Sequence, residues 1–474
     1  MDAHPPRQPL TRAPGAPARR RRGPRLAALA ALVALASLGA SSAGCGGAAP
    51  TPVTPTAASA APHPVQFVDD DYPGALARAR REGKLLFVDA WAPWCHSCLS
   101  LRAYVLGDPA LGRLEDRWVF ASVDTERDGS RAFVERFRNT AWPTLWIIDP
   151  KTEEVVLAWA GTTSVDELAS LLADVAEARA KRTPALVTFV DAAHAAHDGR
   201  AAEAARLYRE VLAKAPSEHL RARALEGLVT SLSDAGEREA CVDVARAEAR
   251  AMPKGASLAT VLATGLGCAA ALPAPRGDDL ATYAEAILGQ GGLVADDASG
   301  VYEALVELCG ERRDLQGKRR HAAAWAAFLE ERARASRDPA ARAVFDPHRV
   351  EAYLALEEPA RAIPMLEASA RDFPRDYNPH ARLARVRLAM KDLAEAEAAY
   401  LRASALVYGP RTLRVAALGA DVAEARGDRA AAQARLRDAL AKTEAMPLGR
   451  GQAKLRAGLA TRLAKLDAAA PSGM

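Results

Sequence analysis

The stretch VDAWAPWCHSC, residues 88–98, contains two cysteines, Cys95 and Cys98, separated by two residues. An apolar run, KLLFVDAWA at residues 84–92, leads into it and is bounded by charge, as a buried central strand should be. Such a cysteine pair can be a redox dithiol, one half of a metal site, or two ordinary core cysteines. The flanking sequence has to decide between these three interpretations.

Residues 65–181 predict alternating strands and helices, and therefore an α/β domain. Strands are expected at residues 65–68, 84–92, 118–126, 143–149 and 154–161. Helices are expected at residues 72–83, from the cysteine pair to about Leu106, at 130–138 and at 164–180. Ser164 and Glu167 have the spacing of a capping box at the start of the last helix.

The order of these elements, with the cysteine pair between a buried strand and a helix, resembles the thioredoxin fold. VDAWAPWCHSC matches the active-site stretch of thioredoxins nearly position for position. TAWPT, residues 140–144, matches the segment that carries the cis-proline of that family. WCHSCLSLRAYVLGDPAL, residues 94–111, is similar to the C-terminal periplasmic domain of the disulfide-interchange protein DsbD and its relatives. Three matching elements in the right order make the resemblance specific.

The resemblance implies thiol–disulfide exchange, which needs a thiolate, a second thiol within reach and a route for a proton. Cys95 would lie at a helix N-terminus, where free N–H groups stabilise an anion, and would be the attacking sulfur. Cys98, one turn further on, would be the resolving sulfur. His96, as an imidazolium, would favour the Cys95 thiolate. The alternative is that His96 is a solvent-facing turn residue with a small effect.

By the same resemblance, Asp89 would be the buried acid that takes and returns the proton of Cys98. Burial would raise its pKa and suit it to proton transfer near neutral pH. The alternative is a strand-end Asp that is hydrogen-bonded to the backbone. Thioredoxins have a Lys near this acid, and Phe120 stands at that position here, so the Asp–Lys pair of the family is missing.

Pro143 would be the cis-proline, whose preceding residue leaves its backbone free to pair with an extended substrate chain. That preceding residue is Trp142, where thioredoxins often have Ile or Thr, so a different substrate preference is expected. Trp91 and Trp94 would form the walls around the dithiol. Ordinary aromatic packing is the alternative for both, and it is compatible with that role.

A structural zinc site needs a second cysteine pair, or a distant pair of histidines, beside the first. The sequence has no second CxxC, so the fold context favours a redox dithiol over zinc, and no cofactor is expected. A dithiol that is present but idle is the remaining alternative.

Residues 183–470 carry no strand signals and predict an all-α helical-repeat solenoid. Gly199 and Gly236 open two similar segments 37 residues apart, and a period of 36 separates Lys391 from Gly427. This resembles the tetratricopeptide (TPR) family in divergent form, with about seven helix pairs and a closing helix near 450–468. Stacked pairs leave a concave face, and the resemblance implies a protein or peptide ligand there.

Three further cysteines, Cys241, Cys268 and Cys309, lie in this helical region. They are interpreted as buried small side chains, and a disulfide between two of them is the alternative. His194 and His197 lie three residues apart on an expected helix. A solvated helix face is favoured for this pair over a metal-ligand pair.

Residues 1–44 predict an export signal, with an arginine-rich start and a short apolar stretch at residues 26–38. SSAGC, residues 41–45, resembles the lipobox of bacterial lipoproteins, which implies lipidation of Cys45; ordinary cleavage near Ala40 or Ala43 is the alternative. Residues 45–64 are rich in Pro, Ala and Thr and are expected to be a disordered tether. Gly46 follows the lipidated position, and by resemblance this favours the outer membrane over the inner one.

The formal net charge of the chain is +4, and residues 1–44 contribute seven Arg and one Asp. The remaining chain therefore carries −2 and has no long basic run, which argues against nucleic-acid binding.

These features lead us to expect an exported, lipid-anchored thiol–disulfide oxidoreductase of the periplasm or cell envelope. Its substrates would be protein thiols and disulfides, held by the repeats, and a membrane electron donor would recycle it. Resemblance to the DsbD domain favours reduction, although export alone allows oxidation equally. The alternative is an envelope scaffold in which the repeats bind partners and the thioredoxin-like part is a docking module.

Overall fold

The computed structural model describes residues 63–181, 183–214 and 216–468. The expected signal, Cys45 and nearly all of the tether lie outside the described residues. Within the described ranges, no helix is both long enough and apolar enough to span a membrane.

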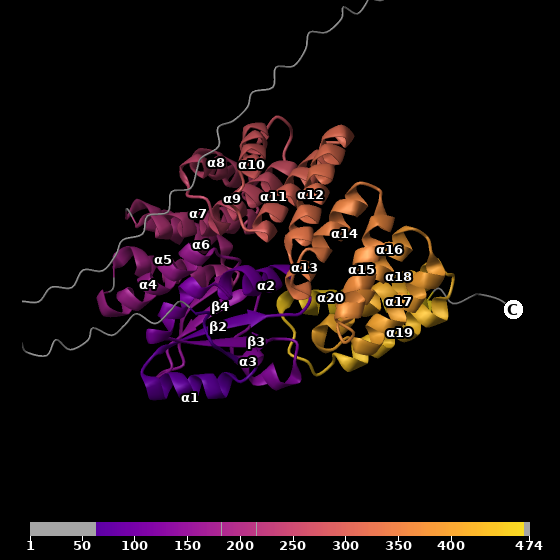
Figure 1. The fold of residues 1–474 in the computed structure, drawn as a ribbon, viewed down its shortest axis with the longest axis horizontal. Helices are drawn as coiled ribbons and strands as arrows, with labels where there is room; N and C mark the ends of the chain where they lie inside the picture. The colour runs from indigo at the N-terminus through magenta and orange to yellow at the C-terminus, as the bar shows by residue number, and fades with distance from the viewer. Residues whose placement is uncertain (1–62, 182, 215, 469–474) are drawn as a thin grey trace, which may run out of the picture. The chain divides into compact units, whose positions relative to one another are not determined.

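The N-terminal part contains a five-stranded mixed sheet in the order β1-β3-β2-β4-β5 (Figure 1). The strands are β1 (Phe67–Asp69), β2 (Leu85–Trp91), β3 (Trp118–Asp124), β4 (Thr144–Ile148) and β5 (Val155–Ala160). β2 pairs with β3 in parallel and with β4 in antiparallel orientation, so the strand before the cysteines is central. The predicted strands and the α/β class are confirmed.

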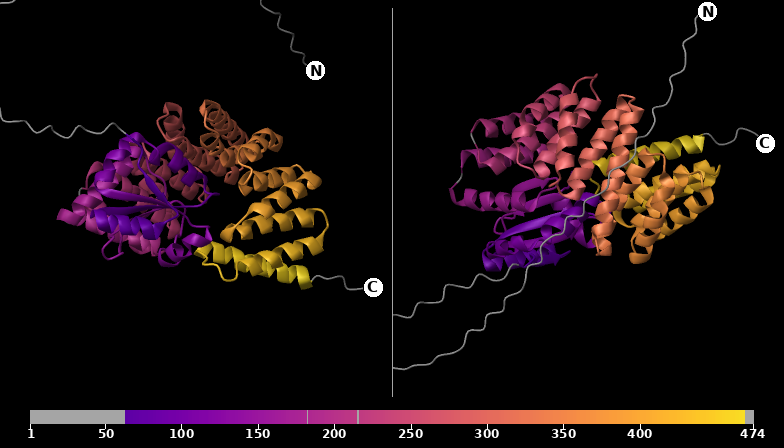
Figure 2. Two further views of the ribbon diagram at one scale, coloured as in Figure 1. Left: turned by 60° about the horizontal axis from the view of Figure 1, so that its bottom comes forward. Right: turned by 45° about the horizontal axis from the view of Figure 1, so that its top comes forward.

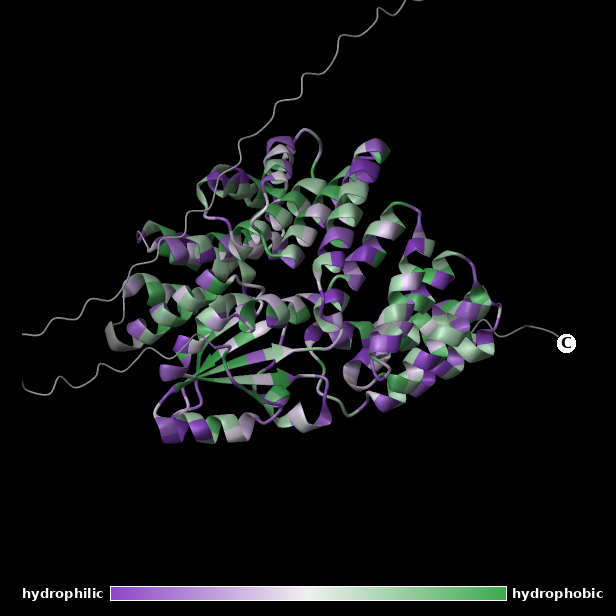
Figure 3. Ribbon diagram, viewed as in Figure 1, coloured by the Kyte–Doolittle hydropathy of each residue, from purple (hydrophilic) through white to green (hydrophobic). Residues whose placement is uncertain are grey.

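Helices cover both faces of this sheet (Figure 1). One face carries α1 (Tyr72–Glu82) and, after the 3₁₀ turn η3 (Asp128–Ser130), α3 (Arg131–Arg136); the other carries α2 (His96–Leu101), its π-helical continuation η1 (Arg102–Leu106), the 3₁₀ helix η2 (Pro109–Asp116) and α4 (Val165–Lys181). Side chains of β2 alternate between them: Leu86 and Val88 pack with α1, and Leu85 and Phe87 face the other side. Green strands in Figure 3 mark this apolar layer.

From Pro184 onward the described residues form helices alone, as the sequence predicted. The first part comprises α5 (Pro184–His197), α6 (Ala201–Ala213), α7 (Glu218–Asp234), α8 (Arg238–Glu248), η4 (Ala249–Ala251), α9 (Ala256–Ala270), α10 (Asp278–Gln290), α11 (Ala295–Glu311) and α12 (Leu315–Ala335). The second comprises α13 (Pro339–Ala343), α14 (Asp346–Ala355), η5 (Pro359–Ala362), α15 (Ile363–Asp372), α16 (Tyr377–Ala389), α17 (Leu393–Leu406), η6 (Gly409–Arg411), α18 (Thr412–Ala425), α19 (Arg429–Lys442) and α20 (Arg450–Ala468). Seven successive pairs and a closing helix can be followed, which confirms the helical-repeat class.

The repeating glycines of the sequence mark the turn inside a helix pair. Gly199, Gly236 and Gly427 follow the first helix of their pairs and have φ angles of 77°, 77° and 76°. A side chain rarely adopts this left-handed conformation, so glycine fits the turn best. Lys391, from which the period of 36 is counted, also has a positive φ of 61°, so the period of 36–37 residues reflects a left-handed turn at corresponding positions of these pairs.

The sheet and the first repeat helices share one apolar core. Trp159 of β5 stacks on Phe189 of α5, with ring centroids 5.7 Å apart. Glu167 completes the predicted capping box with Ser164, and its carboxylate also accepts hydrogen bonds from the backbone N–H groups of Ala256 and Ser257 at the start of α9. One side chain thus caps two helices from different parts of the fold. Figure 2 shows the first helices lying against the sheet.

A disulfide joins Cys241 of α8 to Cys268 of α9, and Cys309 is not in a disulfide with any described residue. The interpretation of these cysteines as unpaired buried side chains is therefore wrong for two of the three. Cys241 and Cys268 lie on neighbouring helices within the core, and their spacing in the sequence does not reveal how these helices pack.

Candidate functional site

Cys95 and Cys98 form a disulfide at the start of α2, with Cα atoms 5.2 Å apart. Cys95 is the N-cap residue, and the backbone N–H of Cys98 donates a hydrogen bond to the Cys95 sulfur at 3.1 Å. Cys95 is 4% exposed and Cys98 is fully buried. The more exposed sulfur is therefore the one that receives a helix N–H group, and this contact favours a thiolate there.

Asp89 lies on β2 and is fully buried. Among the described residues neither of its carboxylate oxygens has a hydrogen-bond partner. Burial raises the pKa of Asp89 to about 7, while Arg102 opposes the shift and Asp69 adds to it. The alternative of a backbone-bonded Asp does not apply, because no backbone N–H of the described residues reaches it.

Arg102 is a member of the site that sequence reasoning missed. It begins the π-helical turn η1, and its guanidinium lies 4.3 Å from the centroid of the Trp91 ring and 3.6 Å from Asp69. The prediction that Phe120 stands beside Asp89 is wrong, because Phe120 lies opposite Phe87 in the sheet and packs against its ring, and Ser122 is the residue opposite Asp89. Arg102, the cation that opposes the rise in the pKa of Asp89, therefore lies on η1, the continuation of the helix that begins after Cys95.

The peptide bond between Trp142 and Pro143 is cis, as the resemblance implied. The indole N–H of Trp142 donates to the Thr125 hydroxyl at 2.8 Å, and its ring meets that of Trp94 edge-on, with centroids 5.3 Å apart. Trp91, Trp94 and Trp142 all pack against the cluster formed by the two cysteines and Ala92. The three tryptophans thus surround the disulfide.

Trp94 is held by residues outside the predicted motif. Its indole N–H donates to Glu126 at 3.0 Å, and the guanidinium of Arg411 lies 4.6 Å from the centroid of its ring. Burial raises the pKa of Glu126 to about 6. The backbone N–H of Arg411 also donates to Glu126, at 2.8 Å. A buried acid and a residue from the repeats therefore fix one wall of the site.

His96 does not face solvent freely as a turn residue would. Its Nδ1 lies 3.0 Å from Oδ1 of Asp296, at the start of α11, and Nε2 of His348 on α14 lies 3.0 Å from the same oxygen. Burial lowers the pKa of His96, but the nearby Asp296 carboxylate outweighs it, so the net shift is upward. Helices α11 and α14 of the repeats thus contact the residue between the two cysteines of the disulfide.

The repeat helices contact the surrounding loops as well. Tyr408 donates to Asp124 at the end of β3, at 2.9 Å. The hydroxyl of Tyr104 on η1 donates a hydrogen bond to the carbonyl oxygen of Ala341 at 3.0 Å. The surface around the disulfide is therefore shared between the thioredoxin-like part and helices far along the chain.

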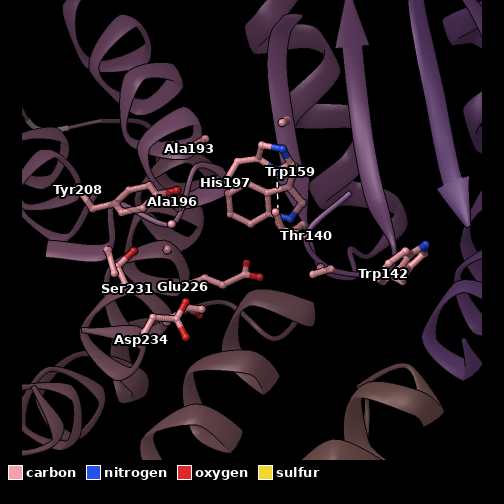
Figure 4. Close-up of a pocket in the computed structure, with 18 of the residues that line it drawn as sticks. Thr140, Trp142, Trp159, Ala193, Ala196, His197, Tyr208, Glu226, Ser231 and Asp234 are labelled. Carbon is pink, nitrogen blue, oxygen red and sulfur yellow. Dashed lines mark hydrogen bonds between the residues drawn. The ribbon is translucent and has the colours of Figure 1, made fainter. Parts of the chain in front are cut away.

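A cavity of about 680 Å³ opens beside the cis-proline loop. Trp142 lies at one end, Trp159 of the edge strand β5 forms one side, and His197, Tyr208 and Glu226 line the helical side (Figure 4). The carboxylate of Glu226 is buried, which raises its pKa to about 7. The cavity thus joins the cis-proline loop to the first helix pairs.

The predicted solvated face of the histidine pair is corrected by these contacts. His197 packs edge-on against Trp146, with ring centroids 4.9 Å apart, and lines the cavity. Burial lowers the pKa of both His194 and His197. The face is covered because the helix lies against the end of the sheet.

The fold and site define a thioredoxin-like domain followed by helical repeats. Residues 66–150 match a family model described as Thioredoxin-like. Protein disulfide-isomerase erp38 of Neurospora crassa is 32% identical over 115 residues, 23% of this chain and 30% of the relative. Protein disulfide-isomerase 1 of Dictyostelium discoideum is 30% identical over 110 residues, with the same coverage. The chain therefore spans about a third of the length of these relatives.

Two solved helical-repeat structures are similar to a larger part of the chain. A tetratricopeptide repeat protein from Parabacteroides merdae covers 58% of this chain and 98% of its own, with 12% identity and a TM-score of 0.37. The TPR2AB domain of yeast Sti1, solved in complex with pHSP90, covers 60% and 98%, with 14% identity and a TM-score of 0.23. With scores this low, the assignment of helical repeats rests on the helices of this chain itself.

Proposed function

We propose that this protein is an exported, membrane-anchored thiol–disulfide oxidoreductase that reduces disulfides of protein substrates. The main support for redox activity is the position of the Cys95–Cys98 disulfide at a helix N-terminus. The same domain contains the cis peptide bond before Pro143 and the buried Asp89, whose carboxylate has no hydrogen-bond partner among the described residues. The likeness to two protein disulfide-isomerases, over 115 and 110 residues, supports this chemistry.

In the proposed reaction the reduced protein attacks a disulfide of its substrate. The Cys95 thiolate bonds to one substrate sulfur, the substrate S–S bond breaks, and the other substrate sulfur leaves as a thiolate. Cys98 then attacks Cys95, which restores the disulfide between them and releases the second substrate thiol. Two electrons pass from the dithiol to the substrate.

Asp89 has a defined place in the second step. Cys98 is fully buried and must lose its proton before it can attack. Asp89 has a pKa of about 7, so it is partly ionised near neutral pH and can accept that proton. Asp89 becomes neutral when it accepts this proton, so no negative charge is buried there until the proton passes to solvent.

The cavity beside the cis-proline loop is the proposed place for the substrate segment. Its lining joins Trp142 to repeat residues such as Tyr208 and Glu226. A chain that pairs with the backbone before Pro143 would therefore reach the helices directly. This gives the helical repeats a role in holding protein substrates.

The direction of electron flow can be tested by the reduction potential of the pair. Purified protein is equilibrated in glutathione buffers, and the fraction of the Cys95–Cys98 disulfide is measured by thiol labelling. A value near that of thioredoxin, roughly −270 mV, supports a reductant that needs an electron donor. A value nearer roughly −120 mV means an oxidant instead, and contradicts the reductase proposal.

Export and anchoring rest on the first 45 residues of the sequence. The proposed location is the periplasmic side of the envelope, at the outer membrane, with a membrane protein supplying electrons. Fractionation of cells that express the protein, with mass spectrometry of the N-terminus, tests this. A lipidated Cys45 is expected, and replacement of Cys45 by Ser should release the protein from the membrane.

The scaffold function remains as the second candidate, because helices make up most of the described residues. Replacement of both Cys95 and Cys98 by Ser separates the two. Partner capture that survives unchanged favours a scaffold. Capture that is lost in this variant, but trapped by Cys98→Ser alone, favours a mixed disulfide formed by Cys95.

A further inference from the structure

Three metal-ligating side chains from three separate elements converge next to the dithiol. His96 begins α2, Asp296 lies in the first turn of α11, and His348 lies in the first turn of α14. Their ligand atoms all lie within 4.8 Å of one another. The rings of the two histidines are 4.2 Å apart between centroids. Residues 52 to 252 positions apart are therefore brought to a single point.

Two of the three side chains are buried, and the third leaves a route to solvent. The side chains of Asp296 and His348 are 6% and 4% exposed, whereas that of His96 is 36% exposed. A cation could therefore enter past His96 and be held between the two buried ligands. Sites of this kind, with a path for entry, are accessible to exchangeable metal ions.

The contacts present without an ion are compatible with a metal in the same place. Oδ1 of Asp296 lies 3.0 Å from a nitrogen of each histidine, so one carboxylate oxygen faces two imidazole nitrogens. Each nitrogen must carry a proton to bond this oxygen, and a divalent cation would replace both protons with one charge centre. The other oxygen of Asp296 lies 3.3 Å from His96, so the carboxylate can turn toward an ion from either side.

The surroundings hold further polar groups that have no partner among the described residues. Oδ2 of Asp297, the residue after Asp296, and Oγ of Ser299, further along α11, are buried and have no hydrogen-bond partner among the described residues. Ser97 Oγ lies 3.3 Å from Nδ1 of His96. Such groups can orient the ligands or hold a bound water.

We propose that His96, Asp296 and His348 form a binding site for a single divalent transition-metal ion, with Zn²⁺ as the ion that the ligands suit best. Two imidazoles and one carboxylate are a donor set found in zinc proteins, and three protein ligands leave a coordination position for water. The ion would tie the dithiol helix to two helix pairs of the repeats. It would also hold the ring of His96 neutral, and so change the charge next to Cys95.

The test uses full-length protein with the Cys95–Cys98 and Cys241–Cys268 disulfides intact and with Cys45 and Cys309 replaced by Ala. No cysteine thiolate can then bind the ion. Zn²⁺ is titrated by calorimetry, and Co²⁺ by its visible absorption. We expect one ion per chain, and a loss of affinity of at least about tenfold in Asp296→Asn and in His348→Gln.

His321→Gln is the matched control. His321 is also a buried repeat histidine with a carboxylate neighbour, Glu285 at 3.2 Å, but it belongs to a pair and not to the cluster of three. The His321→Gln variant should bind the ion as tightly as the unaltered protein does. If Asp296→Asn does not fold, His96→Asn at the partly exposed ligand decides instead.

The proposal is overturned if the oxidised protein binds neither ion, or if the variants at Asp296, His348 and His96 bind as tightly as the control. In that case the three side chains are a hydrogen-bonded junction and nothing more. Neither outcome depends on turnover, so a failure of the redox proposal and a failure of the metal proposal remain separate results.

Discussion

The side-chain amide of Asn378 on α16 donates a hydrogen bond to the carbonyl oxygen of Pro93 at 3.1 Å, although 285 residues separate the two. Pro93 lies in the loop that leads into Cys95. A helix near the end of the repeats therefore holds the backbone two residues before Cys95, the proposed attacking residue.

Asn378→Ala should loosen this loop and make reduced Cys95 easier to reach. A hydrogen bond of this kind contributes about 0.5–1.5 kcal/mol, so we expect alkylation of Cys95 to become roughly two- to tenfold faster. Stopped-flow labelling with a small alkylating reagent measures this rate. Arg385→Ala, on the exposed side of the same helix, is the control and should leave it unchanged. Equal rates in both variants would contradict a role for Asn378 in access.

Asp89→Asn should slow the resolving step and remove its dependence on pH near neutrality. The unaltered protein should gain rate as pH rises through about 7, because ionised Asp89 accepts the proton of Cys98. We expect the variant to be slower by at least about tenfold. The release of substrate from a preformed Cys95 mixed disulfide measures the step. Ser122→Ala, opposite Asp89 on β3, should keep the inflection.

The same residue should make stability depend on pH. Because the folded-state pKa of Asp89 is raised to about 7, its contribution is fully present below about pH 4 and is lost as pH rises through about 7. Relative to Asp89→Asn, the unaltered protein should lose roughly 3–4 kcal/mol between these limits. Urea unfolding at several pH values measures the difference. A difference that stays constant with pH would contradict the raised pKa.

Loss of the second disulfide should destabilise the helical repeats. The bond between Cys241 and Cys268 closes a loop with a sequence separation of 27. By the loop-entropy relation, Cys241→Ser with Cys268→Ser should lower the free energy of unfolding by about 3.5 kcal/mol. Cys309→Ser is the control, and it should change the free energy of unfolding little. Unfolding in denaturant under non-reducing conditions gives both values.

Ala196→Trp should fill part of the cavity beside Trp142. Ala196 is exposed and lines the cavity, so an indole there would occupy the space proposed for the substrate segment. The kcat/KM for a protein disulfide should fall about tenfold further than that for a small-molecule disulfide. Ala202→Trp, exposed on α6 and outside the cavity lining, should not discriminate. An equal loss for both substrates in Ala196→Trp would remove the cavity from the substrate path.

The local parts of the fold and site could be predicted because their signals lie within short stretches. The apolar run before Cys95, the proline in TAWPT and the glycines of the repeats each determine structure within a few residues of themselves. The bounds of the strands differ from the expected ones by a few residues at most. The roles assigned to Asp89, His96 and the tryptophans stay predictions, which the experiments above address.

The rest of the site could not be predicted because it is assembled by tertiary packing. Asp296, His348 and Arg411 reach the dithiol only after the repeats have folded, and a helical sequence gives no register for such contacts. Arg102 lies close to Cys98 in the sequence, but its position over the Trp91 ring depends on a π-helical turn that no sequence motif predicts. The Cys241–Cys268 pair required the packing of α8 on α9.

The apolar layer shared by Trp159 and Phe189 has a consequence for how this protein can be divided. Part of the apolar cover of the sheet is supplied by the repeats. A fragment of residues 65–181 alone would expose this apolar surface to water. A fusion of the thioredoxin-like part to another protein would need another element to cover the surface that α5 covers here. The thioredoxin-like part and the helical repeats therefore form one structural unit, and a substitution on one side of their shared core must fit the side chains on the other.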